Sequence, residues 1–415
     1  MTSNVTLPQG TKNHGDPSIL CLPPNWTDYF TFYAANYLVH IATIVSEPGQ
    51  TMLETICHST MAFFMPGYGA LRAVNFLISN ATISGKNNLQ KAAKAGALCM
   101  LVAWKDLDHV CNNRLGRDDS WFTKNFLIEG YPEFVPHGRK VQGNCSFDER
   151  IYCLIKVPPH IPLKEYYPGP ARSQEENSSE TQHIPAEDIE VTPVSDGLKV
   201  AVSIYQVIWG IATLYEVRGN QITLYGYGAF GLTVVPYAWM SLVNLATNLL
   251  RPTYQVMYLI YTPDLDNVPY ASGMVASIDR PWEPREDIPK LSLDRRHPWG
   301  ARRIALLYIF GCLLAALVPL AVVGGFSGFR QGSELTYDQN WILSWYIVSP
   351  ISSIAFYWLF VTTHPRFPRE GDQKENDTGN PISLLIGFLS LGIPAVGGMV
   401  VVADMLKDFG ICARL

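Results

Sequence analysis

Charged side chains are scarce in this sequence. They make up 16% of the 415 residues, below the roughly 25% of ordinary soluble domains, whereas apolar residues make up 48%. The formal net charge is −5, so the chain has no basic excess, and this excludes a generally basic, nucleic-acid-binding protein. We therefore expect a chain dominated by apolar segments and no nucleic-acid partner.

The motifs of the common catalytic and metal-binding classes are also missing. The eight cysteines include no CxxC pair and no Cys/His cluster, so a structural zinc site is not expected. No HExxH, GxSxG, P-loop or paired-aspartate prenyl-diphosphate motif occurs, and no internal repeat suggests an inverted-repeat transporter. Residues 1–27 lack the basic and apolar regions of a cleavable signal peptide, so the first span is expected to serve as the targeting signal.

Long hydrophobic runs are what the sequence has instead. Ile304–Phe326 carries no charge over 23 residues and is long enough to cross a hydrocarbon layer of roughly 30 Å as a helix. Further runs of this kind are Tyr29–Ser46, Leu198–Tyr215, Thr223–Leu250, Trp341–Thr363 and Ile382–Met405. The predicted fold class is an all-α membrane protein with six or seven transmembrane helices and small mixed cytoplasmic segments, so the lipid bilayer is the expected partner.

The runs divide the chain into seven parts. These are a polar tail (1–27), a first span with a broken or re-entrant helix (28–79), a polar segment with an acidic linker (80–196), a two-span hairpin (197–251), a second polar segment (252–303), a three-span bundle (304–406) and a tail (407–415). Within the polar segments, Gly96–Trp104 is expected to be a buried strand or short helix, and Arg150–Val157 and Ala271–Ile278 are expected to be strands. The acidic stretch from about 165 to 196 is expected to be disordered.

Basic residues are distributed unevenly among the loops. Lys and Arg concentrate in the two large polar segments and in the link before the last span, so the positive-inside rule places these parts in the cytoplasm. The side on which the N-terminus lies depends on Thr51–Ser79, whose apolar run is interrupted by Pro66-Gly67-Tyr68-Gly69. This segment either crosses the membrane as a kinked helix or enters and leaves on one side as two half-helices.

The two versions make different predictions for the ends of the chain. If Thr51–Ser79 crosses, the N-terminus is cytoplasmic. If it is re-entrant, six spans remain and both termini face the lumen or the outside. The glycosylation sequons at Asn4 and Asn25 can then be used, and Cys21 and Cys412 could form a disulfide in an oxidising compartment. The re-entrant version reconciles the charge asymmetry with these sequons.

Ionisable side chains inside the apolar runs are candidates for function, because they are costly at membrane depth. Glu54 and His58 are four residues apart and, together with His40, could form a two-histidine, one-carboxylate site for zinc or iron, or a proton relay. In the alternative interpretation, Glu54 lies near the membrane interface and the histidines bond to backbone or to Asn36. Asp404 is a weaker candidate of the same kind.

Uncharged polar residues form a second group inside the runs. Asn244 and Asn248 are four apart and are expected to make interhelical hydrogen bonds or, alternatively, to line a substrate cavity. Gln206 and Thr213 share a face of the preceding span and are expected to point into the same interior. Gly226–Gly231 fits GxGxxG by letter, but no strand precedes it and it opens a charge-free span, so we expect close helix packing there.

Two stretches carry a family likeness. One is NYLVHIAT (Asn36–Thr43), and the other is an LY-x-x-RG turn (Leu214–Gly219) followed by YGYGAFGLTVVPYAWMSLVN (Tyr225–Asn244). Both resemble a group of fungal multi-pass integral membrane proteins of unassigned function. The likeness covers the first span and the central pair of spans. It implies a fungal source and a location in the endomembrane system or plasma membrane, and it brings no activity, cofactor or catalytic residue with it.

Three functions are compatible with this pattern. The first is a small-molecule or ion permeation path, because charge-free spans surround a few polar groups. The second is a membrane-embedded enzyme of fungal secondary metabolism, such as a cyclase, isomerase or oxygenase, with His40, Glu54 and His58 as its acid–base or metal groups. The third is a non-catalytic scaffold that holds soluble partners through its cytoplasmic segments. Base rates for multi-spanning proteins favour permeation.

Overall fold

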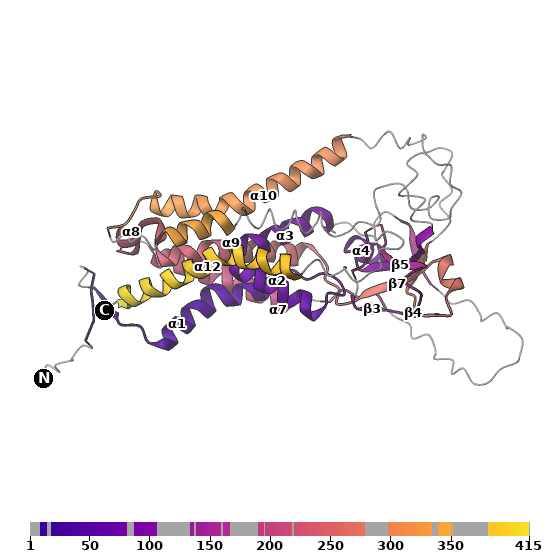
Figure 1. The fold of residues 1–415 in the computed structure, drawn as a ribbon, viewed down its shortest axis with the longest axis horizontal. Helices are drawn as coiled ribbons and strands as arrows, with labels where there is room; N and C mark the ends of the chain where they lie inside the picture. Colours follow the sequence, from indigo (N-terminus) through magenta and orange to yellow (C-terminus); the bar gives the residue numbers. More distant parts are fainter. Residues whose placement is uncertain are drawn as a thin grey trace, which may run out of the picture.

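The computed structural model describes residues 9–14, 18–80, 87–105, 133–136, 138–158, 161–166, 190–194, 196–217, 220–278, 298–333, 339–349, 351 and 381–414. Three helical stretches within these residues are long and apolar enough to cross a membrane: Gly197–Glu216, Phe230–Leu250 and Ile309–Ser327. Figure 1 shows an elongated molecule in which the helices follow the long axis, both termini lie at one end and a β-sheet lies at the other. We refer to the terminal end and the sheet end below.

The first helical stretch is irregular. α1 (Trp26–Tyr33) starts with a capping box, in which the Asn25 side chain accepts from the backbone of Asp28 and the Asp28 carboxylate accepts from the backbone of Asn25. The chain then continues as a π-helix, η1 (Ala34–Leu38), and a 3₁₀-helix, η2 (Val39–Thr43). Such departures from α-helical geometry often occur at functional sites.

Residues 51–79 form a helical hairpin. α2 (Met52–Phe64) ends at Met65, and α3 (Pro66–Asn80) begins with Pro66, a residue that is well tolerated in the first turn of a helix. His58 and Arg72 each lie seven residues from Met65, and their side-chain nitrogens Nε2 and Nη1 are 2.9 Å apart. The two helices therefore fold back on each other as an antiparallel pair with the break at Met65.

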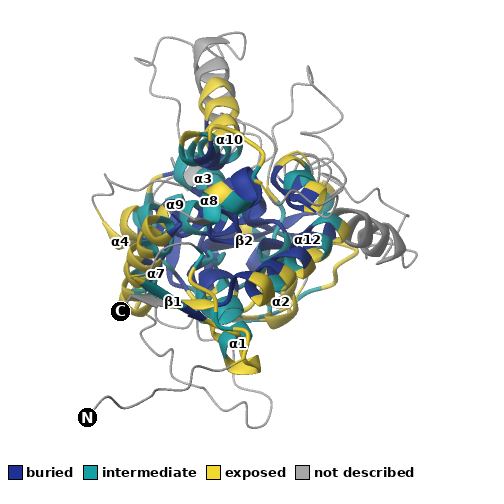
Figure 2. Ribbon diagram, turned by 90° about the vertical axis from the view of Figure 1, so that its left-hand side faces the viewer, coloured by how far each residue is buried: buried dark blue, intermediate teal, exposed yellow. Residues whose placement is uncertain are grey.

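The central helix of the bundle is α9 (Val235–Leu250), which follows α8 (Asn220–Tyr225), η3 (Gly226–Gly228) and η4 (Phe230–Val234). Around it lie α7 (Gly197–Glu216), α10 (Pro298–Ser327), α12 (Pro381–Phe409) and helical residues at 339–349. In the apolar stretch of Phe230–Leu250, which comprises η4 and α9, 67% of the residues are buried. The corresponding share is 17% in α7 and 28% in α10. Figure 2, viewed along the long axis, shows this buried centre surrounded by exposed faces.

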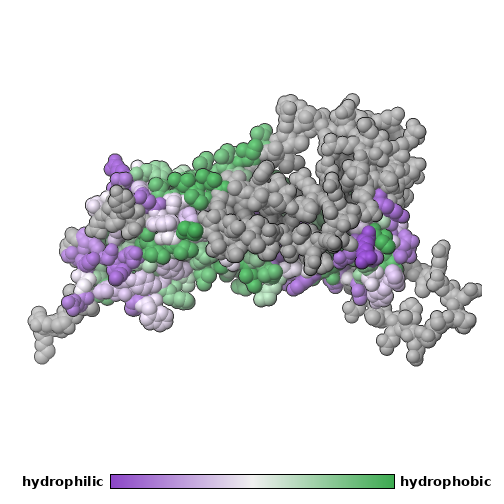
Figure 3. Space-filling view, viewed as in Figure 1, coloured by the Kyte–Doolittle hydropathy of each residue, from purple (hydrophilic) through white to green (hydrophobic). Residues whose placement is uncertain are grey.

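The outer helices direct apolar side chains away from the bundle. Ile208 of α7 is 62% exposed and Leu317 of α10 is 54% exposed. In Figure 3, hydrophobic residues cover α10 and the middle of the bundle, whereas hydrophilic residues gather at the two ends. An apolar surface between polar ends, as on this face, is the surface expected of a membrane-embedded bundle.

The glycine-rich stretch at 226–231 lies in η3 and η4 and provides close packing. Gly226 has a φ of +56°, and a Cβ at this position would lie 2.1 Å from the carbonyl oxygen of Arg330. A Cβ on Gly231 would lie 2.1 Å from the Val217 side chain. The expectation of helix packing is confirmed, and the helix α8 directly precedes the motif, where a dinucleotide site would require a strand.

The two polar segments meet in one six-stranded mixed sheet. Its strand order is β5-β2-β7-β9-β6, and β3 also pairs with β7. The strands are β2 (Leu98–Ala103), β3 (Val141–Gln142), β5 (Tyr152–Lys156), β6 (Leu163–Glu165), β7 (Met257–Tyr261) and β9 (Ala276–Ile278). The all-α class is therefore too narrow, because the described residues combine a helical bundle with a folded sheet.

The strands predicted from local patterns agree well with the observed ones. Gly96–Trp104 contains β2, which is buried at all six positions because α4 (Asn88–Lys94) covers one face and β4 (Asn144–Ser146) and β8 (Tyr270–Ser272) lie on the other. A strand buried on both faces is expected to be continuously apolar. Arg150–Val157 contains β5. The single strand predicted at Ala271–Ile278 is instead two, β8 and β9.

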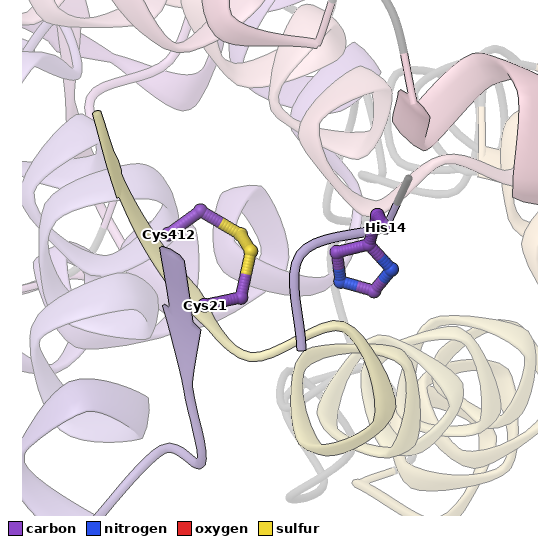
Figure 4. A group of neighbouring side chains, drawn as sticks. All are labelled: His14, Cys21 and Cys412. Atoms are coloured by element: carbon purple, nitrogen blue, oxygen red, sulfur yellow. A yellow bond between two sulfur atoms is a disulfide. The ribbon is translucent and has the colours of Figure 1, made fainter. Parts of the chain in front are cut away.

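A two-stranded clasp joins the ends of the chain. β1 (Ile19–Leu22) pairs antiparallel with β10 (Ile411–Arg414), and Cys21 lies opposite Cys412. The structure joins these two cysteines in a disulfide, the pairing considered from the sequence (Figure 4). Several other sequence predictions fall outside the described residues, namely the sequon at Asn4, most of the acidic linker at 165–196 and the end of the span predicted at Trp341–Thr363.

Candidate functional site

Polar side chains line up where the first span packs against α7 and α9. We call this group the polar seam: Asn36, His40, Thr43, Gln206, Ser241, Asn244 and Asn248. Each has at most 9% of its surface exposed. Polar groups buried among apolar helices cost free energy unless they are hydrogen-bonded, so the bonding of this group indicates what it can do.

Thr43 is the hub of the seam. Its hydroxyl donates to the His40 carbonyl oxygen at 2.7 Å and accepts from Asn244 Nδ2 at 3.1 Å. Its carbonyl oxygen accepts from Asn248 Nδ2 at 3.3 Å, and His40 Nδ1 lies 2.7 Å from the Ser241 hydroxyl oxygen. Asn244 and Asn248 thus make the interhelical hydrogen bonds expected of them.

The terminal end of the seam is formed by Asn36. Its Oδ1 accepts from Trp209 Nε1 at 3.2 Å and from Thr213 Oγ1 at 3.1 Å, and its Nδ2 donates to the Phe32 carbonyl oxygen at 3.0 Å. Asn36 therefore bonds to α7, whereas His40 bonds to α9. Residues four apart would share a face of an α-helix, but here the π-helix η1 and the 3₁₀-helix η2 rotate the chain differently and direct the two side chains to different helices.

Four buried polar atoms of the seam have no hydrogen-bond partner among the described residues. They are His40 Nε2, Asn244 Oδ1 and both amide atoms of Gln206. A buried polar group left unpaired costs roughly 1–3 kcal/mol, and small hydrogen-bonding species such as water commonly satisfy such groups. The unpaired atoms include donors and acceptors, so the seam can receive a species that does both.

Gln206 lies at the same depth as the seam's histidine. α7 runs antiparallel to the first span, because Lys199 Nζ donates to Ser46 Oγ at 3.0 Å and Trp209 Nε1 donates to Asn36 Oδ1. Interpolation between these two contacts places Gln206 opposite residues 39–40. The unpaired groups of α7, α9 and the first span are therefore concentrated in one layer.

At the sheet end a second polar group, which we call the arginine cluster, connects the bundle to the sheet. It consists of Glu47, Glu54, His58, Arg72 and Arg139. Glu47 lies 3.4 Å from Arg72 and 2.9 Å from Arg139, nitrogen to oxygen, and Glu54 lies 3.3 Å from Arg139. Burial alone would raise the pKa of the Glu47 carboxyl, but the positive charges of Arg72, Lys156 and Arg139 outweigh burial and hold this pKa at about 2.

The trio of His40, Glu54 and His58 does not form a site, which corrects one sequence-based hypothesis. Both ring nitrogens of His58 are occupied, Nδ1 by the Tyr68 hydroxyl at 2.6 Å and Nε2 by Arg72. Glu54 caps the start of α2, and its side chain is 30% exposed. His40 bonds to Ser241 in the seam. Glu54 and the two histidines therefore belong to separate networks, and neither histidine bonds to Asn36.

A different group is the one among the described residues whose ligand atoms are close enough to hold a metal ion. It comprises His14, Cys21 and Cys412, whose ligand atoms lie within 4.8 Å of one another (Figure 4). Both sulfurs are joined in the disulfide and offer no thiolate, so this state is not a metal centre. Asp404, the remaining ionisable candidate, is exposed on α12.

Sequence reasoning missed Thr43, Ser241 and Arg139. Ser241 lies three residues before Asn244 and seven before Asn248, so a search for polar residues on one face of α9 would have found it. Thr43 lies three residues after His40 and carries the same kind of signal. Arg139 gave no signal, since it lies more than eighty residues from its partners and belongs to the polar segment.

No family model, no curated protein and no solved structure matches this chain.

Proposed function

We propose that this protein is an integral membrane protein that conducts protons along the polar seam. The observation that carries the proposal is the layer of fully buried, unpaired donors and acceptors around His40 Nε2. His40 is the ionisable member of the seam, and histidine is the side chain whose ordinary pKa suits proton exchange near neutrality. Because the seam has no carboxylate, it suits protons better than metal cations, which prefer carboxylate oxygens.

The proposed topology has six spans and a re-entrant hairpin. The spans are residues 26–43, α7, η4 with α9, α10, the helix that includes 339–349, and α12, while α2 and α3 enter and leave on the sheet side. The antiparallel hairpin and the placement of both termini at one end support this arrangement. It places the sheet in the cytoplasm and the clasp in the lumen or outside, in the endomembrane system or plasma membrane.

In this proposal His40 passes protons by using its two ring nitrogens. A proton arriving at Nε2 gives the imidazolium form, which releases the proton from Nδ1 to the hydroxyl of Ser241. The Ser241 hydroxyl lies 3.4 Å from Thr43 Oγ1, and a water molecule held by the unpaired Asn244 Oδ1 would accept the proton there on the way to the sheet end. Gln206 and Asn36 are the polar residues that extend the proposed path from His40 toward the terminal end.

The other two functions are less well supported. The enzyme hypothesis depended on His40, Glu54 and His58 as one acid–base or metal group, and these residues belong to two separate networks. The scaffold hypothesis depended largely on the acidic linker, most of which lies outside the described residues. For the permeation hypothesis, the polar seam supplies a specific set of residues that could form the path.

Proton flux through the purified chain in liposomes tests the proposal. Vesicles carry a pH-sensitive dye, and a potassium gradient with valinomycin drives proton entry. Wild-type protein is expected to carry protons, and His40→Gln, which keeps a polar side chain but cannot exchange a proton, is expected to lower the flux by about 10²-fold. Ser241→Ala is expected to lower it as well.

His58→Gln is the matched control, since this histidine lies in the arginine cluster. At the same folded fraction as wild type, His58→Gln is expected to conduct protons at the wild-type rate. Protein-independent flux, or equal flux in wild type and His40→Gln, would contradict the proposal.

A further inference from the structure

Three side chains of the clasp carry metal-binding atoms and lie close together, although they are far apart in the sequence. They are His14, Cys21 and Cys412, and the two cysteines are separated by 391 positions. Their ligand atoms, one imidazole nitrogen and two sulfurs, lie within 4.8 Å of one another. Figure 4 shows the His14 ring to one side of the disulfide. Only the fold brings this group together, so no motif in the sequence could reveal it.

The position of His14 is fixed by contacts with α12. Its ring stacks on Phe409, with 4.4 Å between the ring centroids and 10° between the planes, and its Nε2 lies 2.8 Å from the Phe409 carbonyl oxygen. Nearby, Lys12 Nζ donates to the carbonyl oxygen of Asp408 at 2.9 Å. His14 has a φ of +47°, a conformation that histidine adopts more readily than most residues with a side chain. These contacts hold the imidazole at the end of α12 without using the sulfur–sulfur bond.

Backbone hydrogen bonds hold the two cysteines opposite each other. Each strand of the clasp has four residues, and Cys21 and Cys412 are direct partners in its antiparallel ladder. On its other side, the Cys21 N–H donates to the Lys12 carbonyl oxygen at 2.8 Å, and the Cys21 carbonyl oxygen accepts from the Lys12 N–H at 2.9 Å. Breaking the sulfur–sulfur bond removes none of these bonds, so the reduced thiols are expected to remain face to face.

A dissolved ion can reach this group. Cys412 is exposed and His14 is half-buried, whereas Cys21 is buried. The clasp lies at the terminal end of the molecule (Figure 1). An ion therefore arrives directly from water and does not have to cross the helical bundle.

We propose that the clasp is a redox-controlled zinc site, which binds Zn²⁺ through His14, Cys21 and Cys412 when the disulfide is reduced. A dithiol supplies two electrons and two protons to the disulfide and itself closes to a cyclic disulfide, which leaves two cysteine thiols. Zn²⁺ then binds both sulfurs as thiolates and displaces their two protons. Thiolate and imidazole are ligands that zinc prefers, two thiolates balance its charge, and a water molecule completes the tetrahedron.

Small movements convert the disulfide into this site. Tetrahedral zinc with Zn–S bonds of about 2.3 Å holds two sulfurs ~3.8 Å apart, so sulfurs bonded at about 2.05 Å must separate by roughly 2 Å. Rotation about the Cα–Cβ bonds of the two cysteines supplies this movement without shifting the strands. The His14 nitrogen lies within 4.8 Å of both sulfurs, and zinc requires ~3.6 Å. Oxidation removes both thiolates, so the clasp holds the ion in one redox state only.

Zinc uptake by the full chain in detergent tests this site. The protein is prepared with its disulfide intact, or reduced by a dithiol that is then removed under argon. Each form is titrated with Zn²⁺ against a chromogenic zinc chelator. The reduced form is expected to take up about one Zn²⁺ per chain more than the oxidised form does. Equal uptake by the two forms would overturn the proposal.

Two variants and a control assign the ligands. His14→Ala keeps both cysteines and is expected to weaken binding of the additional Zn²⁺ by more than about tenfold. Cys412→Ser is expected to lose this additional uptake altogether. Cys57→Ser removes an exposed cysteine of α2, outside the clasp, and is expected to bind like wild type. Wild-type affinity in His14→Ala, or lost uptake in Cys57→Ser, would overturn the assignment.

Alkylation shows whether the ion binds these sulfurs. In the reduced wild type, Zn²⁺ is expected to slow the reaction of Cys21 and Cys412 with iodoacetamide, measured by peptide mass spectrometry, and to leave the reaction of Cys57 unchanged. Equal rates for the clasp cysteines with and without saturating Zn²⁺ would overturn the proposal without any variant. The site shares no residue with the polar seam, and His40→Gln is expected to bind Zn²⁺ like wild type. Failure of the proton path and failure of this site are therefore distinguishable.

Discussion

Glu47 holds the helical bundle and the sheet together. The loop that it begins enters the sheet region, where Gly49 accepts from the Lys140 backbone at 2.8 Å and donates to the Gln255 backbone at 3.2 Å. Arg139 Nη1 donates to the Pro48 carbonyl oxygen at 3.1 Å as well as pairing with Glu47. One carboxylate thus neutralises guanidinium groups from both parts of the molecule.

Removing that charge is expected to be costly. Glu47→Gln leaves Arg72 and Arg139, whose side chains are 8% and 5% exposed, without their main counter-charge. We expect a loss of about 2–4 kcal/mol in unfolding free energy, measured by denaturant unfolding in mixed micelles. Glu133→Gln is the control, because Glu133 is 71% exposed in its pair with Lys156 and should contribute less than about 1 kcal/mol. Equal losses would contradict the role given to Glu47.

The pKa of Glu47 also predicts how the stability of the protein changes at acidic pH. The folded-state pKa of Glu47, about 2, lies below its ordinary value of 4.5, so its contribution to stability is complete above about pH 4.5 and declines as the pH falls toward 2. The difference in unfolding free energy between wild type and Glu47→Gln is expected to shrink by up to about 3 kcal/mol over this interval. A pH series on both proteins measures it, since other carboxyl groups contribute equally to the two curves. A constant difference from pH 6 to pH 2.5 would show that the Glu47 charge does not stabilise the fold.

At the scale of elements, the connections at the terminal end depend on close backbone approach. η3 packs against the chain that follows α10, and the Tyr227 N–H donates to the Arg330 carbonyl oxygen at 3.0 Å. Gly226 permits this contact because it has a positive φ and no side chain. A residue with a Cβ would have to push two backbone segments apart.

Gly226→Ala is therefore expected to destabilise the protein. The new Cβ would lie 2.1 Å from the Arg330 carbonyl oxygen and 2.6 Å from the Gly332 nitrogen, and we expect a loss of about 2–4 kcal/mol. Gly325→Ala in α10 is the matched control, since nothing lies within 4 Å of its added Cβ. That change is expected to be neutral or to stabilise by up to about 1 kcal/mol. Thermal unfolding in detergent, followed by tryptophan fluorescence, compares them, and a stable Gly226→Ala protein would show that η3 can move.

Elements were easier to predict from the sequence than their contacts. The run LCMLVA and the alternation in YCLIK identify β2 and β5 locally, and long apolar runs identify α7 and α10. The pairing of β2 with β7 could not be predicted, because two helices of the bundle separate these strands along the chain. The same difference between local patterns and distant contacts applies to the candidate site. Asn244 and Asn248 were found from their spacing, whereas Glu54 was wrongly grouped with His40 because its true partner, Arg139, is distant in sequence.

At the scale of the whole molecule, the two ends differ in cysteine chemistry. The terminal end holds the Cys21–Cys412 disulfide, which is typical of oxidising compartments. The sheet holds Cys99, which forms no disulfide with any described residue, and burial raises the pKa of its thiol to about 12. Because Cys99 remains a protonated thiol, it is unreactive and is compatible with a reducing environment. This asymmetry supports the proposed orientation independently of the basic residues.

Glycosylation tests that orientation directly. Asn25 and Asn144 both begin sequons, and they lie at opposite ends of the molecule, Asn25 before α1 and Asn144 in β4. The cap at α1 uses Asn25 Oδ1, so a glycan on its Nδ2 is compatible with the fold. In a eukaryotic host, the Asn4→Gln, Asn25→Gln double variant is expected to lose the mass shift that endoglycosidase removes from wild type. Asn144→Gln is expected to keep that shift, because the sheet would never meet the glycosylation machinery. A glycan on Asn144 and none on Asn4 or Asn25 would reverse the orientation, placing the sheet on the luminal side and the clasp, with its disulfide, in the cytosol.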